Sequence, residues 1–203
     1  MKRLLLAALS VITAVVAAGA ADEPFEAFKQ ATTQAGCNRF TFLYVLESDV
    51  FDTVDTTRGA AIMSADGRYR VDIGPDTYLY DLTFLYSYSS DNNQVTVERL
   101  ADPVAVQREV SFVARLDDYY TSNIVQPGLE YHLMRRDSTD SSIPTSMTVF
   151  LRPGEAELDR LEFLDINDDL NRMLVLNHEV LTECATAAFL PNFPDSVETI
   201  RLY

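Results

Sequence analysis

Apolar and polar residues alternate in many short segments of the chain, and this alternation predicts β-strands. Tyr69, Val71 and Ile73, for example, alternate with two arginines and an aspartate. An antiparallel strand with one face on a core has this pattern. Similar segments recur between turn-forming residues, and they cover residues 40–47, 69–73, 78–80, 84–88, 94–100, 131–134, 147–151, 158–163, 173–182 and 187–190.

Helical spacing is predicted in two places. Phe25 and Phe28 are three residues apart in segment 22–34, which begins with acidic residues and a proline, as a short amphipathic helix does. Between residues 103 and 120 the apolar residues return at helical intervals, and we expect the main helical insertion there. The apolar residues that share its face are Val106, Val110, Val113 and Leu116.

These elements predict an α+β fold that is mostly β, with about nine to eleven strands and one or two helices. A strongly curved antiparallel sheet with helices against one face accommodates them. The sequence has no internal repeat, and residues 22–203 have the size of a single domain with a sizeable core.

Residues 1–21 have the three-part pattern of a secretory signal peptide. A basic start is followed by an apolar run from Leu4 to Ala18 and then by small residues. The alternative is a membrane anchor, but the run is alanine-rich and shorter than the roughly 20 residues that span a bilayer. There is no cysteine at the cleavage zone for lipid attachment. We therefore expect an exported chain that is soluble after cleavage.

The chain is strongly acidic. It has 16 basic and 31 acidic residues and a net charge of −15, which becomes −17 without Lys2 and Arg3. Such a surface repels phosphate backbones and anionic lipid headgroups, which argues against binding of nucleic acid or of the membrane surface. Docking to a basic partner remains open.

Cys37 and Cys184 are the only two cysteines. An even number in an exported chain allows one disulfide, and two separate buried thiols are the alternative. No CxxC motif is present, so a redox-catalytic role is disfavoured.

The usual signs of catalysis and metal binding are absent from the sequence. The only histidines, His132 and His178, are isolated in strand-like segments. Residues 165–169 place oxygen ligands as a calcium loop does, but the glycine and the final glutamate of such a loop are replaced by Leu170 and Leu176, so an acidic hairpin turn is the better interpretation. Phosphate-binding and nucleophile motifs are also lacking. We expect no enzyme, no metal and no cofactor.

One segment resembles a known family. Asp81, Leu85, Tyr88 and Gln94 match, in order and spacing, the DGxxLWxY motif and following Gln of the periplasmic lipoprotein carriers called LolA, and Tyr86 stands in place of the Trp. Upstream, Gly59 and Tyr69 are similar to the glycine strand and aromatic residue of that family. Downstream, the residues similar to its C-terminal motif are Phe189, Pro194 and Val197.

The sequence departs from the family pattern at three positions. Leu82 replaces a turn glycine, Ser196 replaces a terminal glycine, and Ala65 replaces an arginine that helps to hold the helical lid in the carriers. Arg68 and Arg70 are candidates to replace that arginine.

The resemblance implies an incomplete β-barrel with helices covering the concave face over an apolar cavity. It also implies a monomeric periplasmic carrier that accepts acylated lipoproteins from an inner-membrane exporter and delivers them to an outer-membrane acceptor. The lid would be formed by the predicted helix of residues 103–120. The expected acyl-contacting residues are Phe40, Phe42, Tyr44, Tyr69, Val71, Tyr86, Tyr88, Met147, Val149 and Phe163.

A second hypothesis uses the same half-barrel for a different purpose. In it the domain is a non-enzymatic sensor or regulator that binds an envelope protein and transports nothing. The acidic surface is compatible with protein docking as well as with transport.

Overall fold

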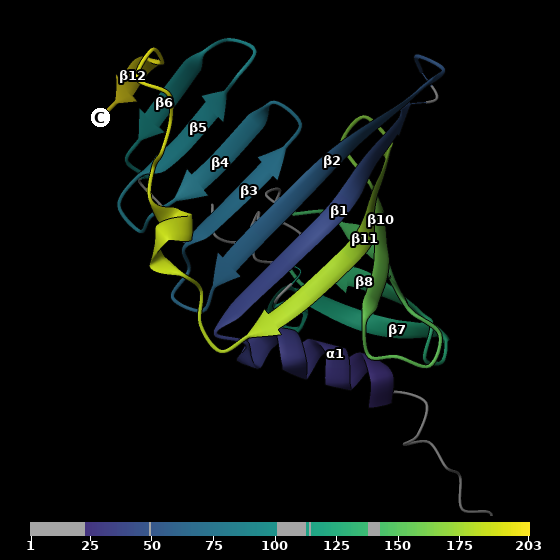
Figure 1. The fold of residues 1–203 in the computed structure, drawn as a ribbon. Helices are drawn as coiled ribbons and strands as arrows, with labels where there is room; N and C mark the ends of the chain where they lie inside the picture. Colours follow the sequence, from purple (N-terminus) through teal and green to yellow (C-terminus); the bar gives the residue numbers. More distant parts are fainter. Residues whose placement is uncertain (1–22, 49, 101–112, 114, 138–142) are drawn as a thin grey trace, which may run out of the picture.

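One twelve-stranded sheet organises the chain (Figure 1). The computed structural model describes residues 23–48, 50–100, 113, 115–137 and 143–203. The strand order across the sheet is β12-β6-β5-β4-β3-β2-β1-β11-β10-β9-β8-β7. The strands are β1 (Cys37–Ser48), β2 (Thr53–Ser64), β3 (Tyr69–Ile73), β4 (Asp76–Tyr80), β5 (Leu85–Ser89), β6 (Gln94–Glu98), β7 (Tyr120–Gln126), β8 (Glu130–Arg135), β9 (Ser146–Leu151), β10 (Leu158–Leu164), β11 (Leu170–Leu181) and β12 (Glu198–Leu202).

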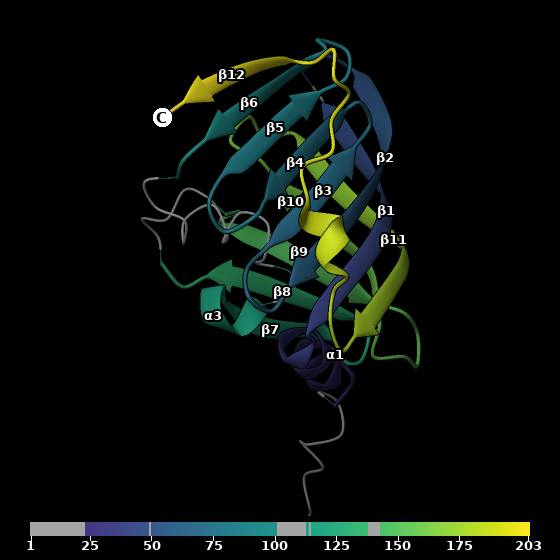
Figure 2. The same cartoon turned by 60° about the vertical axis from the view of Figure 1, so that its left-hand side comes forward.

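The sheet is open and strongly curved. Its three longest strands, β1, β2 and β11, have 12 residues each and form the back. From this back, β3 to β6 and β10 to β7 bend forward as two arms (Figure 2). All neighbouring strands are antiparallel except β12, which pairs in parallel with β6. The predicted curved sheet is confirmed, with one parallel pair at its edge.

Helix α1 (Glu23–Gln34) lies across one end of the sheet (Figure 1). The Phe25 ring stacks on the Tyr131 ring of β8 with centroids 4.1 Å apart, and Phe28 is also buried. The predicted helix at residues 22–34 is therefore confirmed. None of the helices in the described residues is long and apolar enough to cross a membrane.

The second predicted helix is mostly outside the described residues, as are Val106, Val110 and the predicted signal peptide. Its described end is the short helix α3 (Leu116–Tyr119), and the chain enters β7 at Tyr120. Helices covering the concave face therefore stay a prediction.

Most of the predicted strands are confirmed, and the differences have physical reasons. Residues 187–190 form the 3₁₀ helix η2 (Thr186–Phe189) instead of a strand, because the chain turns there to bury Phe189 against the convex face. The alternation did not predict strands β2, β7 and β12, although the family resemblance implied a strand at Gly59 in β2. Few large apolar residues mark β2 and β12, and most residues of β7 are exposed.

Apolar side chains pack on both faces of the sheet and form two clusters. The larger fills the concave side and the space under α1, and it includes Phe28, Phe40 and Leu161. The smaller lies on the convex side, where the segment after β11 crosses β3 to β6 (Figure 1). There Leu79 is fully buried, and the rings of Tyr86 and Tyr88 both contact Phe193.

Cys37 and Cys184 form a disulfide that ties the start of β1 to this crossing segment. The chain approaches closely beside it, because a Cβ atom at Gly36 would lie 1.7 Å from the Thr182 carbonyl oxygen. Only glycine permits this contact. The disulfide and Gly36 together fix where the C-terminal segment leaves the sheet.

Candidate functional site

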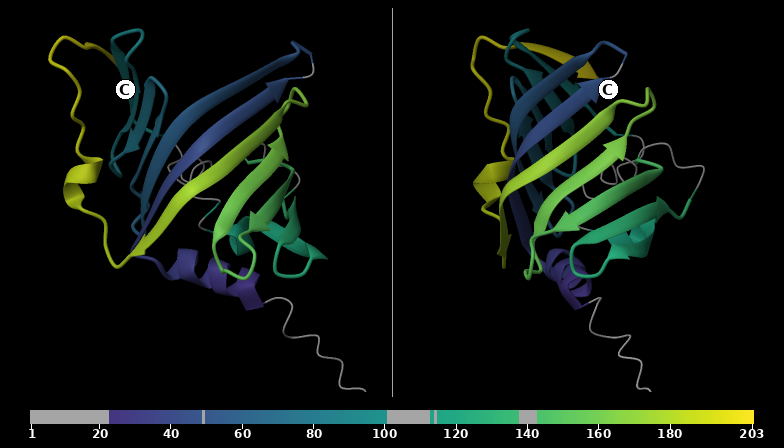
Figure 3. Two further views of the ribbon diagram at one scale, coloured as in Figure 1. Left: turned by 45° about the vertical axis from the view of Figure 1, so that its right-hand side comes forward. Right: turned by 90° about the vertical axis from the view of Figure 1, so that its right-hand side faces the viewer.

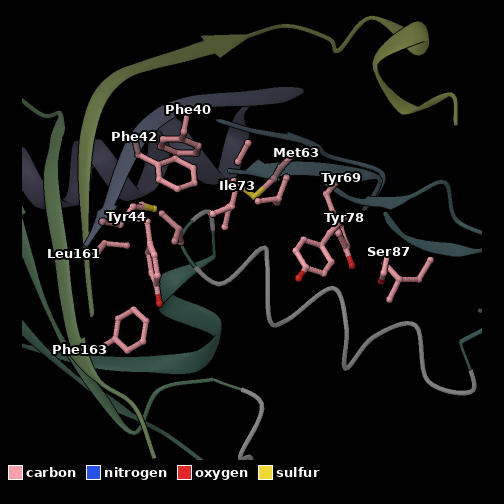
Figure 4. Close-up of a pocket in the computed structure, with 15 residues that line it drawn as sticks. Phe40, Phe42, Tyr44, Met63, Tyr69, Ile73, Tyr78, Ser87, Leu161 and Phe163 are labelled. Atoms are coloured by element: carbon pink, nitrogen blue, oxygen red, sulfur yellow. The ribbon is translucent and has the colours of Figure 1, made fainter. Parts of the chain in front are cut away.

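The concave face holds an apolar cavity of about 450 Å³ (Figure 4). This volume is within the range of roughly 300–1,000 Å³ that is usual for small-molecule sites. The residues that line it are Phe40, Phe42, Tyr44, Ala61, Met63, Tyr69, Val71, Ile73, Tyr78, Leu85, Ser87, Val113, Leu161, Phe163 and Met173.

The alternation of side chains along each strand positions this lining. Phe40, Phe42 and Tyr44 are two residues apart on β1 and therefore point to the same face. The strand register then extends the apolar surface sideways over five strands. The residues paired in this row are Phe40, Ala61, Val71, Tyr78 and Ser87.

A second row closes the opposite wall. Tyr44 pairs with Met173 of β11, and Met173 pairs with Leu161 of β10. Phe163 lies two residues further along the same face of β10. Since the sheet curves between these rows, side chains from distant strands face one space (Figure 4).

The described lining contains no charged side chain. The Tyr44 hydroxyl donates a hydrogen bond to Oδ1 of the buried Asn171, whose amide donates to the Asp169 carbonyl at 2.9 Å. Burial raises the pKa of Tyr44, and the nearby Asp165 carboxylate acts in the same direction. The phenol is therefore neutral at physiological pH, and the cavity offers an apolar environment with a few hydroxyl groups.

Six of the ten predicted acyl-contacting residues line the cavity, and they come from β1, β3 and β10. They are Phe40, Phe42, Tyr44, Tyr69, Val71 and Phe163. Of the predicted lid residues, Val113 lines the cavity and Leu116 is buried in the adjoining core.

The other four predicted contacts lie elsewhere. Tyr86 and Tyr88 point to the convex face, because Leu85 and Ser87 are the residues of β5 that point inward. Tyr86 also donates a hydrogen bond to the Asp81 carboxylate at 3.2 Å. Met147 and Val149 of β9 are fully buried in the concave-side core, where Val149 pairs with the cavity-lining Leu161, but neither lines the described cavity.

Eight of the lining residues were predicted neither as acyl contacts nor as lid residues. Most of them are small or aliphatic and lie one strand away from a predicted residue. The alternation of inward-pointing and outward-pointing residues along β2, β3 and β5 could have indicated several of them. The eight residues are Ala61, Met63, Ile73, Tyr78, Leu85, Ser87, Leu161 and Met173.

Arg68 and Arg70, the candidates to replace the arginine that Ala65 displaces, make their described contacts outside the cavity. The Arg68 guanidinium pairs with Asp66 and stacks 4.7 Å from the Phe189 ring centroid, in the convex cluster. Arg70 pairs with Asp72 at 2.9 Å. Neither side chain is part of the described cavity lining.

No family model and no curated protein sequence matches the chain. Among solved structures, an uncharacterized conserved protein from Thermus thermophilus is similar, with 12% identity and a TM-score of 0.53, over 90% of this chain and 99% of that chain. A LolA superfamily protein from Nitrosomonas europaea has 11% identity and a TM-score of 0.45, over 84% and 97% of the two chains. The chain shares its fold with the Thermus thermophilus protein. A chain of the Pseudomonas aeruginosa MucA/MucB complex is also similar, with 13% identity and a TM-score of 0.40, over 90% of this chain and 64% of that chain.

The LolA-like motif has a distinct geometry in this chain. The Asp81 carboxylate accepts hydrogen bonds from the backbone N–H groups of Thr83 and Phe84, both at 2.8 Å. Leu82, which lies between Asp81 and Thr83, has a φ of +79°, a conformation that favours glycine. This chain therefore forms a turn that favours glycine with a leucine at the position.

Proposed function

We propose that this protein is a periplasmic carrier that binds the acyl chains of lipidated proteins and takes them from the inner to the outer membrane. The observation that supports this function is the cavity on the concave face, which is of small-molecule size and is lined by aromatic and aliphatic side chains. The predicted signal peptide would bring the chain to this compartment.

The energetics of an acyl chain in this cavity are favourable. Each buried methylene contributes ~0.8 kcal/mol, so ten methylenes contribute about 8 kcal/mol. Part of this offsets the cost of immobilising the ligand. Because no described lining residue is charged, a free carboxylate would find no ionic partner inside. Acyl chains in ester or amide linkage are the ligands that this lining favours.

Two neighbouring alanines provide a matched test. Ala61 lines the cavity, whereas Ala60 is the preceding residue of β2 and points to the opposite face. Ala61→Phe should fill part of the cavity and lower the amount of bound lipid at least tenfold. Ala60→Phe adds the same ring outside and should leave binding unchanged.

The readout is native mass spectrometry of protein purified from its own cell envelope, followed by titration of a lipidated peptide. Co-purifying acylated peptides that are lost only in Ala61→Phe support the carrier. An empty cavity in the unchanged protein, together with a stoichiometric protein partner that Ala61→Phe still binds, would instead support the sensor hypothesis.

A further inference from the structure

Two hairpin turns carry large apolar side chains that are exposed to solvent. At the β1–β2 hairpin, Val50 and Phe51 of the turn and Val54 of β2 are 76%, 74% and 63% exposed. At the β10–β11 hairpin, Leu164 at the end of β10 and Ile166 of the turn are 55% and 96% exposed. We call these five residues the tip patch.

The strand register places both turns at the same end of the sheet. Val54 and Leu170 both pair with Glu47, which lies between them on β1. Leu164 is the partner of Leu170 on the next strand. Since neighbouring strands are about 4.8 Å apart, three strand spacings, or roughly 15 Å, separate Val54 from Leu164. Figure 3 shows the two tips beside each other in both views.

The tip patch lies outside the cavity. Tyr44 points inward, so Glu47, three residues further along β1, points to the convex face, and its pairing partners share that face. None of the five residues of the tip patch lines the cavity that would hold acyl chains.

Hydrogen bonds define the backbone of the β10–β11 turn. Asp52 and Asp168 adopt φ of +51° and +63°. The Asp165 carboxylate accepts hydrogen bonds from the N–H groups of Asn167 at 2.8 Å and Asp169 at 3.2 Å. Ile166 is held at the outside of this turn, which means that its exposure is a property of the folded hairpin.

Charge identifies the kind of surface that complements the patch. Residues 50–55 and 164–169 contain five aspartates and no lysine or arginine. Nearby, the Glu47 carboxylate is paired with Arg172 at 2.6 Å. An apolar patch with an anionic rim is repelled by anionic lipid surfaces and attracted by cationic protein surfaces.

We infer that the tip patch docks a protein partner that presents an apolar depression surrounded by lysine or arginine side chains. Phe51 and Ile166 are the central contacts, because aromatic and aliphatic side chains fill the cores of interfaces while charged groups stay at the rim. The five aspartates then supply orientation and a salt-dependent association rate.

Nuclear magnetic resonance titration of the isotopically labelled protein tests this inference. The probe is an amphipathic peptide of leucine and lysine, and the control is a peptide of equal charge in which serine replaces leucine. Amide shifts should concentrate in residues 50–55 and 164–170. The leucine peptide should bind at least tenfold more tightly than the serine peptide and weaken as salt is added.

Variants separate the patch from general surface charge. Phe51→Ser with Ile166→Ser should abolish the tenfold difference, whereas Leu190→Ser, at a residue 56% exposed elsewhere, should retain it. Equal binding of the two peptides, or shifts centred on other residues, would overturn the inference. Co-flotation with phosphatidylcholine or phosphatidylglycerol vesicles that depends on Phe51 would overturn it as well, because the patch would then be a membrane contact.

Discussion

The ring of Phe42 lies directly over Gly59 on the neighbouring strand. A Cβ atom at Gly59 would meet ring carbons of Phe42 at 2.4 and 2.5 Å and the Asp72 carbonyl oxygen at 3.2 Å. The two residues are cross-strand partners in the β1–β2 register. The absence of a side chain at Gly59 therefore determines how far Phe42 projects into the cavity.

Gly59→Ala should push the Phe42 ring toward the cavity and lower the free energy of unfolding by about 1–3 kcal/mol, as overpacking does. Phe42→Leu removes the ring atoms that clash, so Gly59→Ala should cost about 1 kcal/mol less in that background. Urea denaturation of the two single variants and the double variant measures this coupling. Strictly additive costs would show that the ring does not depend on the glycine.

Leu82→Gly should stabilise the protein by about 0.5–1 kcal/mol. The left-handed backbone of Leu82 costs about 1–2 kcal/mol for a residue with a Cβ atom, and the greater freedom of glycine in the unfolded chain offsets part of this gain. Leu82 is 46% exposed, so little burial is lost. Leu82→Ala is the control for urea denaturation, since it keeps the Cβ atom and should give no gain.

Loss of the Cys37–Cys184 disulfide should destabilise the protein by about 3–5 kcal/mol, because it closes a long loop in the unfolded chain. The two cysteines are separated by 147 positions. Chemical denaturation with and without a reductant measures the difference. In the double variant Cys37→Ala/Cys184→Ala the reductant should have no effect, which distinguishes the disulfide from other targets of reduction.

The environment of His178 predicts a loss of stability in acid. Burial lowers the pKa of His178, and Arg152 acts in the same direction while Glu157 opposes it. The His178 ring stacks on the Phe40 ring with centroids 4.1 Å apart, and its Nε2 lies 3.1 Å from Asn38 Oδ1. The folded state therefore disfavours the protonated ring. The contribution of the neutral His178 ring to the free energy of unfolding is complete above the ordinary histidine pKa of about 6.5. It decreases as the pH falls below that value.

Measurement of the unfolding free energy at pH 7.5 and pH 5.5 checks this prediction. His178→Gln has no titrating ring but keeps an amide that can bond to Asn38. The loss on acidification should be smaller in this variant than in the unchanged protein. An equal loss in both would assign the acid sensitivity to the carboxylates instead.

The sequence predicted the fold well where one face of a strand differs from the other. On β3, Tyr69 and Val71 alternate with charged residues, and the strand has the predicted bounds. On β5 the alternation misleads, because both faces are covered: the cavity is on one side and Phe193 with the C-terminal segment is on the other. Aromatic content then favoured Tyr86 and Tyr88 over the inward residues Leu85 and Ser87.

Elements that depend on distant partners were the least predictable. The parallel pairing of β12 with β6 depends on where the chain returns after crossing the convex face, and no local pattern encodes that return. In the same way, the position of Ala61 in the cavity could not be predicted from its local sequence, because it depends on the strand register that pairs Ala61 with Phe40 and Val71.

The pairing of β12 with β6 also sets an order of events during folding. β6 is complete at Glu98, but the strand that covers its free edge begins at Glu198, after five further strands have been made. Until then β6 exposes unpaired backbone groups, which can recruit other chains. A folding intermediate in which β6 has formed before β12 is therefore the one most exposed to association with other chains.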